Sequence, residues 1–178
     1  MKNVYYSKKI YNIEILVSTK IEIDIIKKAL LFIKTHAPQS FSRLKKLQAI
    51  IIYPNKDYNN ILFPKENIYI CQQGTIIESS MPYLASLLIH EAHHLLQYKK
   101  DQKHHGQKTE EEAYEAQRKF LKKYGTKAEV DWLDNLFKNE WWIKRDKKTK
   151  KIIYDKNDDI LKNLLINYQK NKITKILI

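Results

Sequence analysis

The chain has 178 residues, 43% of them hydrophobic, and carries a formal net charge of +13. This length is sufficient for one domain with a buried core, and no apolar run approaches the roughly 20 residues of a membrane-spanning helix. Because residues 1–18 are interrupted by charge and lack the continuous apolar stretch of a signal peptide, we expect a cytoplasmic protein.

The first elements are predicted as strands followed by a helix. Residues 4–17 alternate loosely and are rich in Tyr, Ile and Val, which is typical of one or two strands. Thr19 and Glu22 have the spacing of a capping box. They predict a helix that runs to about His36 and is stopped by Pro38.

Two more strands are predicted before the middle of the chain. Residues 47–53 form an apolar run that ends at a proline, and residues 67–72 form a second short run followed by a glycine. Between them, residues 54–66 are rich in Pro, Asn, Asp and Lys, so we expect a loop there.

A long helix is predicted next, and it carries most of the polar residues of interest. Ser79 or Ser80 can cap its start, and Pro82 lies where a first-turn proline is tolerated. The helical period continues to about Tyr98, and a polar connection follows. Thr109 is expected to cap the next helix.

The C-terminal third is predicted to be helical with one charged interruption. The helix after Thr109 is expected to end at Gly125, and residues 127–143 also read as helical. Charge dominates 144–159, and the tail after it begins as an amphipathic helix. We therefore predict one domain over 1–143 and a charged hinge with a C-terminal extension over 144–178.

The stretch LLIHEAHHLLQY, residues 87–98, combines histidines with an apolar helical pattern. At about 100° per residue, one broad arc holds the apolar side chains: Leu84, Ala85, Leu88, Ile89, Ala92, Leu95 and Leu96. The opposite arc holds Ser86, His90, His93, His94 and Gln97. This second arc has too little charge for an ordinary solvated face. With the apolar arc in the core, we expect the histidines to line a surface or cleft.

The spacing of His90, Glu91 and His94 is the H-E-x-x-H pattern, and its geometry explains its chemistry. Histidines four residues apart on a helix project from the same side and can bind one tetrahedral ion. Glu91 is offset by about 100°, beside the ion. There it can take a proton from metal-activated water and pass it to a leaving amine.

Other histidines and the lone cysteine leave alternatives open. His93 falls near the same arc and can replace a ligand, support one, or simply lie at the rim. His104 and His105 follow in the polar connection and are weaker candidates for a third ligand. Cys71 lies in a predicted strand, where a thiolate could reach the metal but a small buried side chain is the commoner role. As the only cysteine, it excludes a disulfide within the chain.

A catalytic zinc ion needs three protein ligands and one open position. The helix after Thr109 offers several glutamates, and a helical wheel separates them. Glu110 lies at the centre of its apolar arc, where a buried carboxylate needs a partner. Glu112 lies at the margin and is the alternative ligand. Ala113 is small enough to let this helix approach the histidine helix closely.

HEAHH followed by EEEAYEA resembles the gluzincin branch of zinc metallopeptidases. In that branch the third ligand is a glutamate on a second helix, often within an E-x-x-A pattern. The similarity covers roughly residues 49–125. It implies an α+β fold with a small zincin-like core. In that core a short, twisted, mainly antiparallel sheet packs on an active-site helix and a glutamate helix, and here a C-terminal helical extension follows.

The resemblance also implies a role for each residue. His90, His94 and Glu110 would bind one zinc ion per chain, and Glu91 would act as general base and then acid. The residues 67–72 occupy the place of the edge strand that pairs with an extended peptide or protein substrate. Larger members carry an acidic residue where this chain has Tyr114.

Two groups of the predicted site have no assigned residue. The group that orients His90 is unassigned, and so is the oxyanion-stabilising group, for which Tyr114, Tyr124 and His105 are candidates. The function predicted on these grounds is that of a zinc metalloendopeptidase, a hydrolase of peptide bonds.

The high positive charge leaves two further hypotheses. A basic chain favours acidic partners such as nucleic acid, so a DNA-associated protease is one alternative. However, only Arg43, Arg118 and Arg145 of the 33 basic residues are arginine, and specific readers of phosphates and bases depend on arginine. The other alternative is an inactive, zinc-stabilised binding module. No membrane partner is expected, and the sequence leaves the oligomeric state open.

Overall fold

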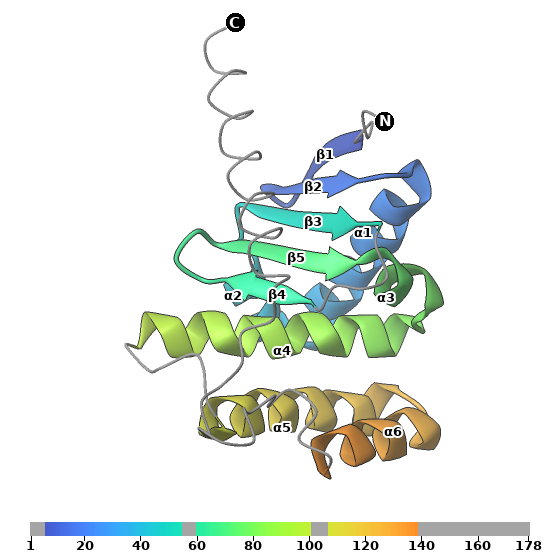
Figure 1. Ribbon diagram of the computed structural model, residues 1–178, viewed down its shortest axis with the longest axis vertical. Helices are drawn as coiled ribbons and strands as arrows, with labels where there is room; N and C mark the ends of the chain where they lie inside the picture. The colour runs from blue at the N-terminus through green and yellow to red at the C-terminus, as the bar shows by residue number, and fades with distance from the viewer. Residues whose placement is uncertain (1–5, 55–59, 101–106, 139–178) are drawn as a thin grey trace, which may run out of the picture. The chain divides into compact units, whose positions relative to one another are not determined.

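Figure 1 shows the computed structural model, which describes residues 6–54, 60–100 and 107–138. The strands within these ranges are β1 (Tyr6–Ile10), β2 (Ile13–Val17), β3 (Ala49–Tyr53), β4 (Ile61–Phe63) and β5 (Ile68–Gln72). The helices are α1 (Lys20–His36), α2 (Pro38–Leu44), α3 (Gln73–Glu78), α4 (Met81–Lys99), α5 (Gln107–Tyr124) and α6 (Lys127–Lys138). The predicted α+β class is confirmed.

The sheet has the strand order β1-β2-β3-β5-β4. The three inner strands run parallel, and β1 and β4 each pair antiparallel with their only neighbour in the described sheet. The expected mainly antiparallel sheet is therefore mixed. The prediction that residues 67–72 form the edge strand is wrong, because β5 lies between β3 and β4. The edge strand next to β5 is β4, which lies within the segment predicted as a loop and is short and flanked by turn-forming residues.

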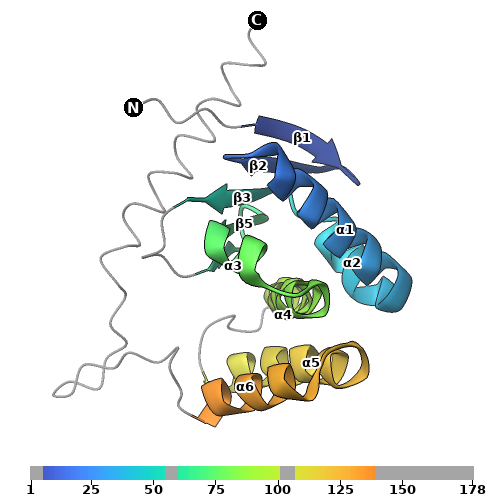
Figure 2. The same cartoon turned by 90° about the vertical axis from the view of Figure 1, so that its right-hand side faces the viewer.

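The core lies between one face of the sheet and the helices. The register places Ile15 beside Ile50 and Ile50 beside Tyr69, so these side chains form a row across the sheet. All three are buried, together with Leu30 of α1 and Leu88 of α4. Figure 2 shows α1 and α2 on this side of the sheet, with α4 below them and α5 and α6 beyond α4. The apolar side of α4 packs into this core, which holds the helix in place against the sheet.

The capping box predicted for α1 is present and has an additional function. The backbone N–H of Thr19 donates to Glu22 Oε2 at 2.9 Å, which closes the first turn. Glu22 is fully buried, and its carboxylate also accepts hydrogen bonds from the Ser18 hydroxyl and the Gln73 side-chain amide. A buried carboxylate needs such donors, so Glu22 ties the end of β2 and the start of α1 to α3.

The structure changes three details of the predicted helices. Helix α1 ends at His36, just before Pro38, as expected. Pro38 is also the first residue of the short helix α2, where a proline is tolerated. Helix α3 follows β5 directly, where no helix was predicted. Helix α5 starts at Gln107, so the prediction that Thr109 caps it is wrong.

Gly125 directly follows α5 at a position with little space for a side chain. Its N–H donates to the Leu121 carbonyl at 2.8 Å, as in a continuing helix. A Cβ atom built there would lie 2.8 Å from Leu121 Cδ2 and 3.0 Å from the Leu121 carbonyl oxygen. The backbone oxygen has little room to move, so glycine is required at this position by close approach.

We expect Gly125→Ala to lower the free energy of unfolding by about 1–2 kcal/mol, because the added methyl group overpacks the turn. Gly74→Ala is the matched control. Its Cβ would meet only the Glu78 side chain, at 3.7 Å, and alanine favours a helix over glycine. Denaturant unfolding of both variants measures the difference. Equal stability of the two would show that the contact at Gly125 has no energetic weight.

None of the helices in the described ranges is long and apolar enough to cross a membrane. The predicted boundary at 143–144, the charged hinge and the C-terminal extension lie outside the described residues.

Candidate metal centre

Helix α4 places its histidines by its start and its period. The helix begins after Ser80, whose hydroxyl accepts a hydrogen bond from the Tyr83 N–H at 3.1 Å, so the predicted cap is confirmed. His90 and His94 then lie on one side of the helix, and both are buried. Helix α5 packs along α4, as Figure 1 shows, and its Glu110 lies near both rings, so the histidines lie between two helices.

Helix α5 brings Glu110 to the two histidines. Ala113 is fully buried, as expected for a small residue where two helices approach closely. Glu110, in the first turn of α5, lies one turn away from it. Its Oε2 is 3.4 Å from His90 Nε2, and its Oε1 is 3.5 Å from His94 Nε2. Residues far apart in the sequence therefore form a compact group.

The His90, His94 and Glu110 group can hold a metal ion. The two Nε2 atoms are 2.9 Å apart, and each lies 3.4–3.5 Å from a Glu110 oxygen. Ligands about 2.0–2.1 Å from a tetrahedral zinc ion are separated by roughly 3.3 Å. Two imidazole lone pairs and a carboxylate facing one point also repel one another unless a proton or a cation lies between them. The donor types and spacing thus fit a metal ion.

The electrostatics of the group favour the charged forms of Glu110 and His94. Burial by itself raises the pKa of Glu110, but hydrogen bonds from His90 and His94 outweigh burial and hold the pKa well below its usual range. For His94 burial has the opposite effect and by itself lowers the pKa. The contact with Glu110 more than reverses this, so the pKa of His94 is raised. Each group prefers an opposite charge beside it.

Glu91 follows His90 in α4 and is buried. Its side chain is only 8% exposed. Burial raises the pKa of Glu91, and the nearby His90 and His94 offset only part of that rise. The Glu91 charge also contributes to the raised pKa of Cys71 on β5. The charge of this carboxylate therefore interacts with both histidines and with the Cys71 thiol.

A hydrogen-bond network surrounds the group on the side of His94. The Gln97 side chain is 2% exposed, and its Oε1 lies 2.8 Å from His94 Nδ1. Gln97 Nε2 donates to Glu112 Oε2 at 3.1 Å. His93 Nε2 is 3.8 Å from the same Glu112 oxygen. Glu112, the alternative ligand, and His93 are thus partners of this network and do not belong to the His90, His94 and Glu110 group.

Sequence reasoning missed the role of Gln97, although a signal for it was present. Gln97 is three residues after His94, on the polar arc of α4. A buried amide at that spacing can reach the histidine ring. His90 differs, since its Nδ1 is buried and has no hydrogen-bond partner within the described ranges.

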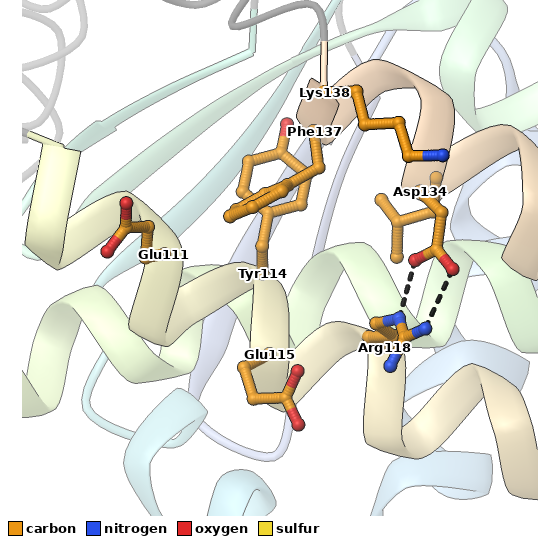
Figure 3. Close-up of a pocket in the computed structure, with 8 residues that line it drawn as sticks. Glu111, Tyr114, Glu115, Arg118, Asp134, Phe137 and Lys138 are labelled. Atoms are coloured by element: carbon orange, nitrogen blue, oxygen red, sulfur yellow. Dashed lines mark hydrogen bonds and ion pairs between the residues drawn. The ribbon is translucent and has the colours of Figure 1, made fainter.

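Tyr114 connects the histidines to a pocket between α5 and α6. Its ring packs edge-on against His90, with centroids 4.8 Å apart, and also against Phe137 at 5.7 Å. Figure 3 shows Tyr114 and Phe137 in a pocket of about 280 Å³, beside the bidentate pair of Arg118 and Asp134. Glu110 does not line this pocket, so the pocket and the candidate metal centre are neighbours that share Tyr114.

The positions of Tyr124 and Cys71 argue against the roles considered for them, which were oxyanion stabilisation for Tyr124 and metal binding for Cys71. Tyr124 lies roughly 20 Å along α5 from Glu110, where it packs against Phe32 and His36 of α1. Cys71 is buried in β5, and burial raises the pKa of its thiol to about 12. Among the described residues it does not belong to the side chains that converge with His90, His94 and Glu110, so the thiolate alternative is not supported. His104 and His105 lie outside the described residues.

Comparisons with protein-family models, with curated proteins and with solved structures gave no match. The geometry of the candidate metal centre in this chain therefore carries the functional conclusion.

Proposed function

We propose that the chain is a zinc metalloendopeptidase with a gluzincin-type site. The observation that carries the proposal is the convergence of His90, His94 and Glu110 from two helices. Glu91, the residue after His90, is buried as well. Two histidines and a carboxylate are a donor set of catalytic zinc sites, in which a fourth position stays open. The gluzincin resemblance of the two sequence motifs is consistent with this arrangement.

In the proposed reaction Glu91 moves the proton. A zinc ion held by His90, His94 and Glu110 would supply Lewis-acid activation of water and of the scissile carbonyl. The Glu91 carboxylate accepts a proton from the attacking water and donates it to the leaving amine nitrogen. A carboxylate can take this double role because it accepts a proton as the base and releases it again as the acid.

The substrate is proposed to lie along β4. An extended peptide can add to the exposed edge of a sheet through backbone hydrogen bonds, and β4 is the end strand of the described sheet. Figure 1 shows β4 at the end of the sheet that faces α4. This assignment replaces the earlier expectation for 67–72 and predicts broad tolerance of substrate side chains.

The test is hydrolysis by the full chain in three states: as purified, after removal of metal with a chelator, and after zinc is added back. A peptide pool of mixed sequence is the substrate, and mass spectrometry identifies new termini. We expect cleavage that is lost with the metal and restored by zinc. Stoichiometric zinc without any cleavage would instead favour the zinc-stabilised binding module.

A further inference from the structure

Gln97 is the only residue in the described part of the chain whose side-chain amide contacts both a candidate metal ligand and the helix that carries the third one. It extends from α4, 2% exposed. Its Oε1 lies 2.8 Å from His94 Nδ1. Its Nε2 lies 3.0 Å from the Thr109 carbonyl oxygen and 3.1 Å from Glu112 Oε2. All three partners are therefore within hydrogen-bond distance of one amide.

The chemistry of these partners fixes the orientation of the amide. A backbone carbonyl and a carboxylate only accept hydrogen bonds, so the NH₂ group must face Thr109 and Glu112. The amide oxygen then faces His94, and an oxygen accepts a hydrogen bond only if Nδ1 carries the proton. In its neutral form, His94 therefore leaves its Nε2 lone pair directed at His90 and Glu110.

We propose that Gln97 is a positioning residue of the metal site. It holds His94 in the Nδ1–H tautomer, with Nε2 free to bind a cation, and the same amide holds the first turn of α5, which places Glu110. The tautomer follows from the hydrogen bonds alone. The effect on metal binding rests on the proposed function.

The arrangement is asymmetric between the two histidines. His90 Nδ1 has no hydrogen-bond partner among the described residues, and packing against Tyr114 holds its ring. A ligand histidine is normally oriented by a hydrogen bond from its second nitrogen. Gln97 performs this function for His94, and it also couples His94 to the helix of Glu110.

The first experiment observes the tautomer directly. Long-range ¹H–¹⁵N NMR of the metal-free full chain, at alkaline pH where imidazole is neutral, distinguishes a protonated from an unprotonated ring nitrogen. A His94→Gln variant identifies the His94 signals. We expect Nδ1–H in the wild type and a mixture of tautomers in Gln97→Met, which keeps the size of the side chain but removes its hydrogen bonds. An Nε2–H tautomer in the wild type would overturn the proposal.

The second experiment measures zinc affinity by competition with a chelator. Gln97→Met is expected to bind zinc about 10–100-fold more weakly than the wild type. The matched control is Gln117→Met. Gln117 is a second buried amide between α5 and α4, and it donates to Ser86 Oγ at 3.3 Å, which is not a candidate ligand. It should lose a comparable hydrogen bond without losing zinc affinity. Equal affinity of the two variants would refute the positioning role.

A polarity swap separates positioning from simple packing. Gln97→Glu places a carboxylate against Glu112 and removes both donors, so zinc affinity should fall as in Gln97→Met. Adding Glu112→Gln restores a donor at residue 112, while the new carboxylate still accepts from His94 Nδ1. We expect the double variant to recover at least tenfold in affinity over Gln97→Glu. No recovery would refute the proposed hydrogen-bond polarity.

The two proposals fail in different ways. A wild-type chain with His94 in the Nδ1–H tautomer that binds no zinc would refute the peptidase and support the assignment of the Gln97 hydrogen bonds. A wild type that binds zinc and cleaves peptides, with the Gln97→Met and Gln117→Met variants indistinguishable from one another, would refute only the role of Gln97.

Discussion

Replacing Glu91 by Gln is expected to abolish peptide hydrolysis while leaving one zinc ion bound per chain. Glutamine has nearly the same shape as glutamate but cannot accept the proton of the attacking water. Loss of a general base typically costs about 10²–10⁴-fold in rate. The fold and the three proposed ligands should be unaffected, because Glu91 is not in the His90, His94 and Glu110 group. Zinc content and the rate of peptide cleavage are measured on the same preparation.

Glu115→Gln is the matched control for this prediction. This substitution makes the same chemical change on an exposed part of α5. The Glu115 carboxylate there lies 3.7 Å from Lys119 Nζ. Its activity should equal that of the wild type. A Glu91→Gln chain that carries zinc and cleaves peptides at the wild-type rate would refute Glu91 as the base.

The stability of the metal-free chain provides an independent check on Glu91. Burial raises the folded-state pKa of this carboxyl above its unfolded value. The folded state then holds more protons, so stability falls as pH rises from the unfolded pKa, about 4.3, through the folded one. Glu91→Gln removes this loss. We therefore expect the metal-free variant to be at least as stable as the wild type at neutral pH, as measured by denaturant unfolding.

Replacing Glu110 by Ala is expected to remove zinc binding, whereas Glu112→Ala retains it. The Glu110 oxygens lie 3.4 and 3.5 Å from the two Nε2 atoms. The Glu112 carboxylate instead contacts Gln97 and His93. Mass spectrometry of the purified proteins should find one zinc ion per chain in the wild type and in Glu112→Ala, and almost none in Glu110→Ala.

Thermal stability checks the same prediction with added zinc, so the result does not depend on how much zinc stays bound during purification. Zinc at 100 times its dissociation constant stabilises a folded chain by about 2.7 kcal/mol, so zinc should raise the melting temperature of the wild type and of Glu112→Ala but not of Glu110→Ala. The reverse pattern would make Glu112 the third ligand. A wild type that gains neither zinc nor stability would make the buried histidines structural.

Local sequence signals predicted the elements that carry the candidate site. The capping residues Thr19 and Ser80 mark the starts of α1 and α4, since a cap is an interaction within one turn. The helical period also placed His90 and His94 on one side of α4 and Glu110 on the inner side of α5. These features depend on residues at most a few positions apart, so the sequence alone was sufficient to predict them.

Features that depend on distant partners were decided by the tertiary structure. The position of β5 inside the sheet depends on its pairing with both β3 and β4, and β4 has only three residues with a weak strand signal. The role of Gln97 depends on the meeting of α4 with α5. Sequence periodicity shows which side of an element is buried. Hydrogen bonds between elements form only when packing brings those elements together, and so the structure alone identified the edge strand and the network around His94.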